Sequence, residues 1–267
     1  MTHRLLAVLT DPATVSACLD AAALAAPALP GCQIEALHVD VDPDHIIASP
    51  EEIDFQQLRE KREGTPAERT AATHAAVNAW RQAHPDTPFE WQCVVGRQEE
   101  VVTERARNAD AVVLARGHDM DSGDAMHAAV LTLDALVLLA PPQFVATQLS
   151  HIAIAWSGSE ASAKVVADAM PWLAAAERVT ILLIDKGEDA ARKLVDELGR
   201  GGIRVGVHAV AGDDRGLGAH FVAEAHAVGA NALVAGAYRH NALIEWALGG
   251  TTRHLLSAAD LPLFLAH

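Results

Sequence analysis

Two similar stretches decide the fold: Asn108 to Ala115, NADAVVLA, and Gly229 to Gly236, GANALVAG. Each follows a run with helical spacing and has the aliphatic composition of a short buried strand. Each is then followed by a loop, a helix and a final apolar strand. Self-similarity of this kind predicts a chain built from two repeated halves.

The same pattern extends outward from both stretches. The expected first strands are residues 5–8 and 152–155, and the expected last strands are 136–139 and 261–265. In the second half we expect strands near 151–156, 178–184, 203–210, 231–236 and 262–266, with helices near 160–175, 188–199, 216–228 and 248–258. Aliphatic runs that alternate with Ala-rich helical runs indicate an α/β protein with parallel strands covered on both faces. The prediction is two Rossmann-like, doubly wound modules, each with a mostly parallel five-stranded sheet.

The expected modules are residues 1–146 and 149–267. The first carries an insertion near 42–66, where Ser49-Pro50-Glu51-Glu52 has the character of a helix start. The apolar last strands, 136–139 and 263–265, would expose unpaired edges if each module stood alone. We therefore expect them to form the seam of an intramolecular pseudo-dimer; a homodimer of whole chains is a further expectation, and protein partners cannot be named.

Charge and cysteine usage exclude several classes of function. The formal net charge is −15, which repels nucleic acid and anionic membrane surfaces, so neither is an expected partner. Three widely spaced cysteines without a C-x-x-C motif indicate no disulfide framework and no zinc site. The apolar run near Leu5 is too short for a signal peptide, and the expected location is the cytoplasm.

The segment from Gly236 to Leu256, GAYRHNALIEWALGGTTRHLL, carries a spaced-glycine pattern. It resembles the nucleotide loop of the universal stress protein family, which runs Gly, two residues, Gly, nine residues, Gly, then Ser or Thr. The resemblance covers essentially the whole second half, including its opening strand and its closing Asp260-Leu261-Pro262-Leu263. It implies a stress-associated protein that binds ATP or a related adenine nucleotide, with no metal beyond the Mg²⁺ that accompanies a nucleotide.

Three of the implied nucleotide-binding residues depart from the family pattern. Arg239 stands in the place of the middle glycine, Gly250 in the place of the first Ser or Thr, and Ser157 in the place of an acidic residue that contacts the nucleoside. The full set is Ser157, Gly236, Arg239, Gly249, Gly250 and Thr252. Loss of a charge-assisted hydrogen bond costs about 1.5 to 3 kcal/mol, so we expect weakened affinity. In the first half, the sequence from Gly117 to Asp124 lacks the spaced glycines and reads as a solvated loop.

Two other functional classes stay open. Ser157 to Ser162, SGSEAS, faintly resembles the pyrophosphate loop of ATP-cleaving α/β enzymes, although Ser159 and Ala161 replace its second Gly and its Asp. No catalytic residue is otherwise suggested. A surface metal site is an alternative to a solvated loop for the cluster His118, Asp119, Asp121, Asp124 and His127, and the solvated loop is the favoured interpretation. The remaining alternative is a ligand-free scaffold that acts through partner contacts.

Overall fold

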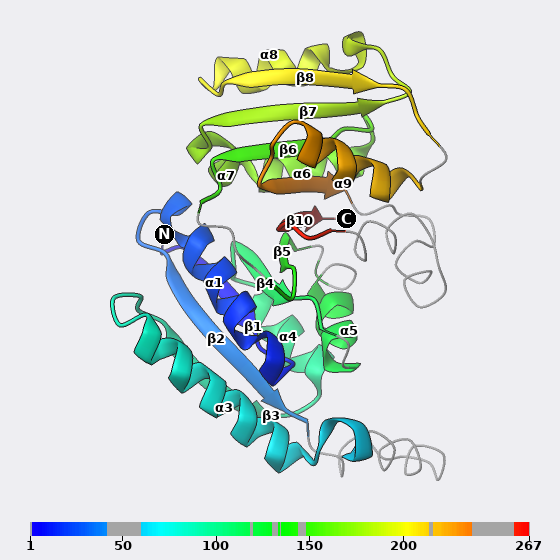
Figure 1. Ribbon diagram of the computed structural model, residues 1–267. Helices are drawn as coiled ribbons and strands as arrows, with labels where there is room; N and C mark the ends of the chain where they lie inside the picture. Colours follow the sequence, from blue (N-terminus) through cyan, green and yellow to red (C-terminus); the bar gives the residue numbers. More distant parts are fainter. Residues whose placement is uncertain are drawn as a thin grey trace. The chain divides into compact units, whose positions relative to one another are not determined.

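The computed structural model describes residues 2–41, 60–117, 120–129, 133, 135–143, 148–213, 216–236 and 259–266. Residue contacts divide the chain into two compact units, Met1–Ala135 and Leu136–His267. Figure 1 shows the strands and helices of both units.

The first unit is a parallel sheet whose strands alternate with helices along the chain. Its order is β3-β2-β1-β4, so the first strand lies between the second and the fourth. The strands are β1 (Arg4–Val8), β2 (Gln33–Asp40), β3 (Glu90–Val95) and β4 (Ala111–Ala115). The helices are α1 (Val15–Ala25), α3 (Pro66–Ala83), α4 (Gln98–Ala106) and α5 (Met120–His127), with short 3-10 turns at Pro12–Thr14 and Ala26–Ala28.

The second unit has the order β5-β10-β9-β6-β7-β8, in which the described pairings are parallel except for β5 with β10. Its strands are β5 (Val137–Ala140), β6 (His151–Ala155), β7 (Arg178–Ile184), β8 (Val205–Val210), β9 (Ala232–Gly236) and β10 (Leu263–Ala266). Its helices are α6 (Glu160–Asp168), α7 (Met170–Ala175), α8 (Arg192–Arg200) and α9 (Leu217–Ala227), with a 3-10 turn at Glu188–Ala191. The predicted α/β class with a mostly parallel sheet is confirmed.

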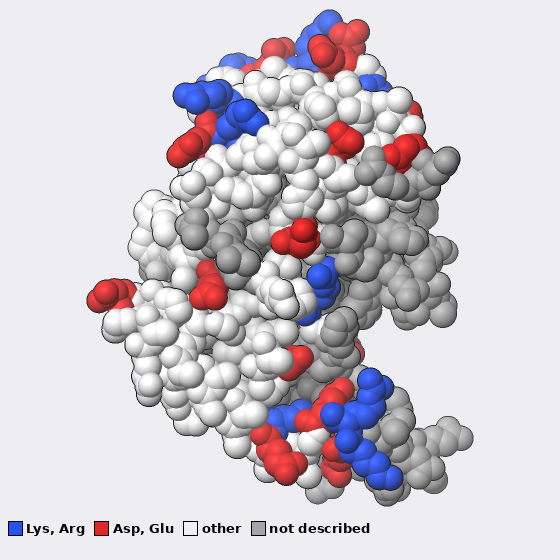
Figure 2. All heavy atoms as spheres, in the orientation of Figure 1, with Lys and Arg blue, Asp and Glu red and all other residues white. Residues whose placement is uncertain are grey.

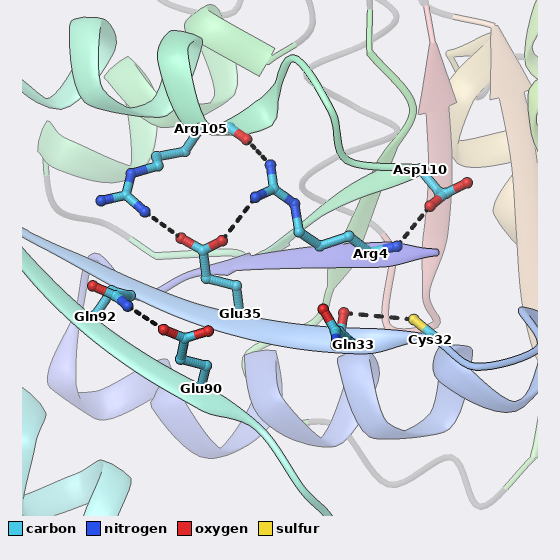
Figure 3. Close-up of polar contacts among 8 residues, drawn as sticks. All are labelled: Arg4, Cys32, Gln33, Glu35, Glu90, Gln92, Arg105 and Asp110. Atoms are coloured by element: carbon cyan, nitrogen blue, oxygen red, sulfur yellow. Dashed lines mark hydrogen bonds and ion pairs between the residues drawn. The ribbon is translucent and has the colours of Figure 1, made fainter. Parts of the chain in front are cut away.

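The strands β8-β7-β6-β9 repeat the order β3-β2-β1-β4 of the first unit. The repetition extends to single hydrogen bonds. The backbone nitrogen of Arg4, which opens β1, donates to Asp110 Oδ2 at 2.7 Å (Figure 3). In return, Asp110 N donates to the Arg4 carbonyl at 2.8 Å. At the start of β6, His151 N donates to Asn231 Oδ1 at 3.2 Å, and Asn231 N donates to the His151 carbonyl at 2.8 Å.

The two apolar terminal strands pair with each other, as the sequence suggests. Phe264 of β10 lies opposite Leu138 of β5, in an antiparallel register. Contacts group β5 with the second unit for this reason, so the division falls after Ala135 rather than after residue 146. Behind β10, the Trp172 ring packs on Phe264 with ring centres 5.2 Å apart.

Burial follows strand position. The described residues of β4, β5, β6 and β10 are all buried, whereas β3 and β8, at the ends of the described strand orders, are partly exposed. Strands that are covered by helices on both faces need continuous apolar runs. This explains why AVVLA and HIAIA form strands although apolar and polar residues do not alternate regularly in them. On the face drawn in Figure 2, basic side chains lie next to acidic ones in several places.

A buried carboxylate lies at the amino end of the first sheet. Glu35 of β2 is 7% exposed and receives hydrogen bonds from Arg4 Nη1 and Arg105 Nη1, each at 3.1 Å. Figure 3 shows Glu35 between the two guanidinium groups, with Arg4 also donating to the Arg105 carbonyl. Two positive partners compensate the desolvation of this carboxylate.

Two expected elements differ in detail. The helix expected over 160–175 is broken into α6 and α7 at Ala169, because Pro171 has no N–H to donate and begins the second helix. The loop expected over 117–124 is helical from Met120 onward. The core of the insertion, residues 42–59, and the helix expected near 248–258 lie outside the described residues. Among the described helices, none is both long and apolar enough to cross a membrane.

Candidate functional site

The second unit has a topological switch point between β6 and β9. From β6 the chain continues to β7 and then β8 on one side, whereas β9 lies on the other side, with Ala155 opposite Ala235 near the carboxyl ends. Open α/β sheets bind ligands outside the carboxyl ends of the strands at such a point. Ser157 follows β6 and Gly236 ends β9, so both residues belong to this edge.

Gly236 lies against the first turn of α6. A Cβ atom at this position would be 2.8 Å from both the carbonyl carbon of Ala161 and the backbone nitrogen of Ser162. Ordinary side chains essentially never make such short contacts with backbone, so the strand and the helix approach closely only because residue 236 has no side chain. The structure thus gives a packing reason for the first glycine of the motif.

The loop after β6 is held by hydroxyl groups. Gly158 has a φ of +76°, a left-handed conformation that glycine adopts without strain. Ser157 Oγ lies 2.8 Å from Ser159 Oγ and accepts a hydrogen bond from Ser159 N at 3.3 Å. Ser157 therefore turns the chain into α6.

The start of α6 is capped from within. Ser159 is the N-cap, and its Oγ accepts a hydrogen bond from Ser162 N at 3.2 Å. The Ser162 hydroxyl donates to the Ser159 carbonyl at 2.8 Å. The hydroxyl groups of SGSEAS therefore cap the helix from within, and Gly236 packs onto the same turn.

Lys186 is a site residue that sequence reasoning missed. It follows β7, and its Nζ donates to the Ser157 carbonyl, which places an exposed cation beside the loop after β6. The preceding Asp185 has a φ of +54°, and its Oδ1 accepts a hydrogen bond from Gly212 N at 2.6 Å. The signal in the sequence is Asp185-Lys186-Gly187 directly after an apolar strand, a turn at the same sheet edge.

Of the six predicted binding residues, the structure describes two, Ser157 and Gly236, and it brings them to one edge. The other four, Arg239, Gly249, Gly250 and Thr252, lie outside the described residues. The structure therefore describes the Ser157 and Gly236 side of the predicted site, and the predicted phosphate contacts stay predictions.

The corresponding edge of the first unit, between β1 and β4, is covered differently. Thr10 follows β1, is 6% exposed, and its Oγ1 lies 2.6 Å from Ser122 Oγ of α5. Asp11 accepts a hydrogen bond from Ala13 N at 2.8 Å and so caps the turn at Pro12–Thr14. Both polar groups at this edge have partners within the unit.

Within the described ranges, His, Cys, Asp and Glu side chains do not gather in any group of three or more suited to hold a metal ion. The stretch 117–124 contains two such residues outside those ranges, His118 and Asp119.

Comparison with known proteins adds the fold relationship. No family model and no curated protein matches the sequence. The crystal structure of a universal stress protein from Archaeoglobus fulgidus DSM 4304 matches with a TM-score of 0.67 at 14% identity, over 98% of this chain and 95% of that one. The chain has the fold of a universal stress protein.

Two Pseudomonas aeruginosa structures share this universal stress protein fold. A functionally unknown protein from strain PAO1 matches with a TM-score of 0.57 at 11% identity, over 99% of this chain and 92% of that one. A protein provisionally assigned as a universal stress protein, from strain UCBPP-PA14, has a TM-score of 0.51 at 10% identity, over 99% and 93% of the two chains. At such identities the likeness establishes the fold, and ligand binding has to be argued from this chain's own residues.

Proposed function

We propose that this chain is a cytoplasmic, stress-associated universal stress protein with two tandem modules, whose second module binds ATP or a related adenine nucleotide with reduced affinity. The observation that carries the proposal is the position of Ser157 and Gly236 at the switch point between β6 and β9. That is where a doubly wound sheet takes a nucleotide. The repeated strand order and the matching bonds of Asp110 and Asn231 support the tandem arrangement.

In this proposal the Ser157 loop and Lys186 face the nucleoside side of the ligand, and Gly236 allows the strand to approach α6. Gly249, Gly250 and Thr252 supply backbone and hydroxyl donors to the phosphates, with Mg²⁺ carried by the nucleotide. The described site offers hydroxyl groups and one ammonium group beside Ser157, and no nucleophile paired with a base. We therefore propose binding without catalysis.

The affinity is reduced because Ser157 brings a neutral hydroxyl where the family pattern has a carboxylate. Its Oγ is also engaged by Ser159. A charge-assisted hydrogen bond is worth about 1.5 to 3 kcal/mol, which corresponds to roughly ten- to a hundredfold in affinity.

The test is calorimetric titration of the purified full chain with ATP and GTP, together with mass spectrometry of any nucleotide that copurifies. Ser157→Asp restores the carboxylate and keeps an acceptor for Ser159 N, so it should tighten ATP binding by about tenfold or more. Ser159→Asp is the matched control, because it adds the same charge two residues away and keeps an N-cap. No ATP heat in either the wild type or Ser157→Asp would reject the nucleotide proposal and favour the ligand-free scaffold.

A further inference from the structure

A buried imidazole in the second unit faces a carboxylate on each side. His220 lies in the first turn of α9 and is 3% exposed. Its Nδ1 is 3.4 Å from Asp213 Oδ1, and its Nε2 is 3.4 Å from Glu224 Oε1. A neutral imidazole carries one N–H and would turn a lone pair toward the second carboxylate, whereas an imidazolium carries two. Only the protonated ring therefore attracts both carboxylates.

The surroundings of His220 fix one of these carboxylates. Glu224 Oε2 lies 2.9 Å from His208 Nε2 of β8, and the Glu224 side chain is 15% exposed. Of the other strands packed on α9, β9 has no titratable residue, and β7 has only Arg178, whose guanidinium donates to the Val228 carbonyl beyond the end of the helix. His226, in the last turn of α9, pairs with Asp260. The groups that face His220 in the described structure are thus Asp213 and Glu224, with His208 behind Glu224.

Asp213 connects this cluster to the sheet edge. It belongs to the β8–α9 loop, residues 211–216, of which 214 and 215 lie outside the described residues. The adjacent Gly212 donates its backbone N–H to Asp185 at 2.6 Å, and Lys186, next to Asp185, donates to the Ser157 carbonyl. Successive contacts therefore run from the buried ring to the loop after β6.

We propose that His220 is a positioning residue: when protonated it holds Asp213 against Glu224, and so fixes the β8–α9 loop that supports Asp185, Lys186 and the Ser157 loop. This contact of His220 with Asp213 and Glu224, the tether, is strongest when the ring carries both protons and weakens when the ring loses one. Its effect on ligand affinity rests on the nucleotide binding proposed above; its effect on the loop does not.

The experiment follows the ring and the loop separately in the full chain. Nitrogen NMR of the ¹⁵N-labelled His220 ring between pH 5 and 8.5 reports its charge, and hydrogen exchange of the Gly212 amide, corrected for intrinsic rates, reports the tether. Protection of Gly212 should fall several-fold as the ring loses its proton, and His220→Gln should abolish that dependence. His226→Gln, on the same helix and away from the loop, should preserve it.

A second variant tests the proposal even if His220→Gln fails to fold. Asp213→Asn removes the other partner from a part-exposed loop position and should also abolish the pH dependence of Gly212 protection. Protection that does not change across the ring titration, or that changes equally in Asp213→Asn, overturns the proposal. If the wild type binds ATP, His220→Gln should weaken binding about fivefold at pH 6; unchanged affinity overturns the link to the site. If the protein binds no ATP, hydrogen exchange of the Gly212 amide still tests the tether by itself.

Discussion

Gly236 and Ser162 approach so closely that a Cβ atom on residue 236 would lie 2.8 Å from the Ser162 backbone nitrogen. The contact joins the end of β9 to the first turn of α6, the two elements that meet at the switch point. It assigns the first glycine of the motif a structural role that holds whether or not a nucleotide is bound.

Gly236→Ala should therefore destabilise the protein. The obstructing atoms belong to backbone and cannot rotate away, and overpacking of this kind costs about 1 to 3 kcal/mol. Gly206→Ala is the matched control: it lies in β8 of the same unit, and a Cβ there meets no atom within 4 Å. Urea unfolding monitored by circular dichroism measures both. Equal stability of the two variants would show that β9 and α6 can separate without cost.

Glu35 should matter for the stability of the first unit. Glu35→Gln leaves Arg4 and Arg105 without a charged partner and should lower the free energy of unfolding by about 1.5 to 3 kcal/mol, the range for hydrogen bonds to charged groups. Glu90→Gln, on the exposed start of β3, is the control and should be nearly neutral. Thermal unfolding measures the stability of both variants. Equal stability of Glu35→Gln and Glu90→Gln would show that the Glu35 contacts contribute nothing to folding.

Two buried histidines predict loss of stability in mild acid. Burial lowers the pKa of His38, whose ring contacts the Leu9 carbonyl and Thr70, and burial together with the Arg178 charge lowers the pKa of His151. Since the unfolded chain binds protons more readily than these native rings, the free energy of unfolding should fall as pH drops below about 6.5, toward the native pKa values.

Chemical unfolding between pH 8 and 5 tests this relation. His38→Asn keeps a donor to the Leu9 carbonyl but does not titrate, so the decline should become shallower. His74→Asn is the control, because that ring is exposed on α3. An acid dependence that is identical in the wild type and His38→Asn would contradict the assignment.

The sequence predicted the strands better than the site. Apolar runs such as AVVLA and LFLA have one stable placement, inside a covered sheet, so their positions followed from composition alone. Pro171 could have marked the break between α6 and α7. By contrast, the contacts of Lys186 with Ser157 and of Thr10 with Ser122 join residues far apart in sequence, and no local pattern encodes them.

The cysteines should differ widely in reactivity. Cys18 is buried in α1, donates to the Val113 carbonyl at 3.4 Å, and burial raises its pKa far above the ordinary range. Cys93 is exposed on β3, although burial of its thiol and the Asp40 charge raise its pKa to a lesser extent. Because the thiolate is the reactive form, iodoacetamide should label Cys93 in the native protein and spare Cys18 until the chain unfolds. Mass spectrometry with and without urea decides it; early labelling of Cys18 would mean that α1 opens readily.

The last prediction concerns Arg239, which occupies the place of the middle glycine of the motif. If the family's backbone at this place is left-handed, an arginine there costs about 1 to 2 kcal/mol, and its side chain occupies space near the expected phosphates. Arg239→Gly should then tighten ATP binding about tenfold or more, whereas Arg239→Ala, which keeps the backbone cost, should gain less.

The opposite outcome follows if the guanidinium pairs with a phosphate. Both variants would then bind ATP about ten- to a hundredfold more weakly than the wild type, because each removes the same charge-assisted hydrogen bonds. We favour the first result, because Ser157 and Gly250 also depart from the family pattern, and several departures in the proposed site indicate relaxed selection for affinity. Calorimetric titration of ATP against the wild type and both variants separates the two. Tight wild-type binding lost equally in both variants would make Arg239 the anchor of a fully working nucleotide site.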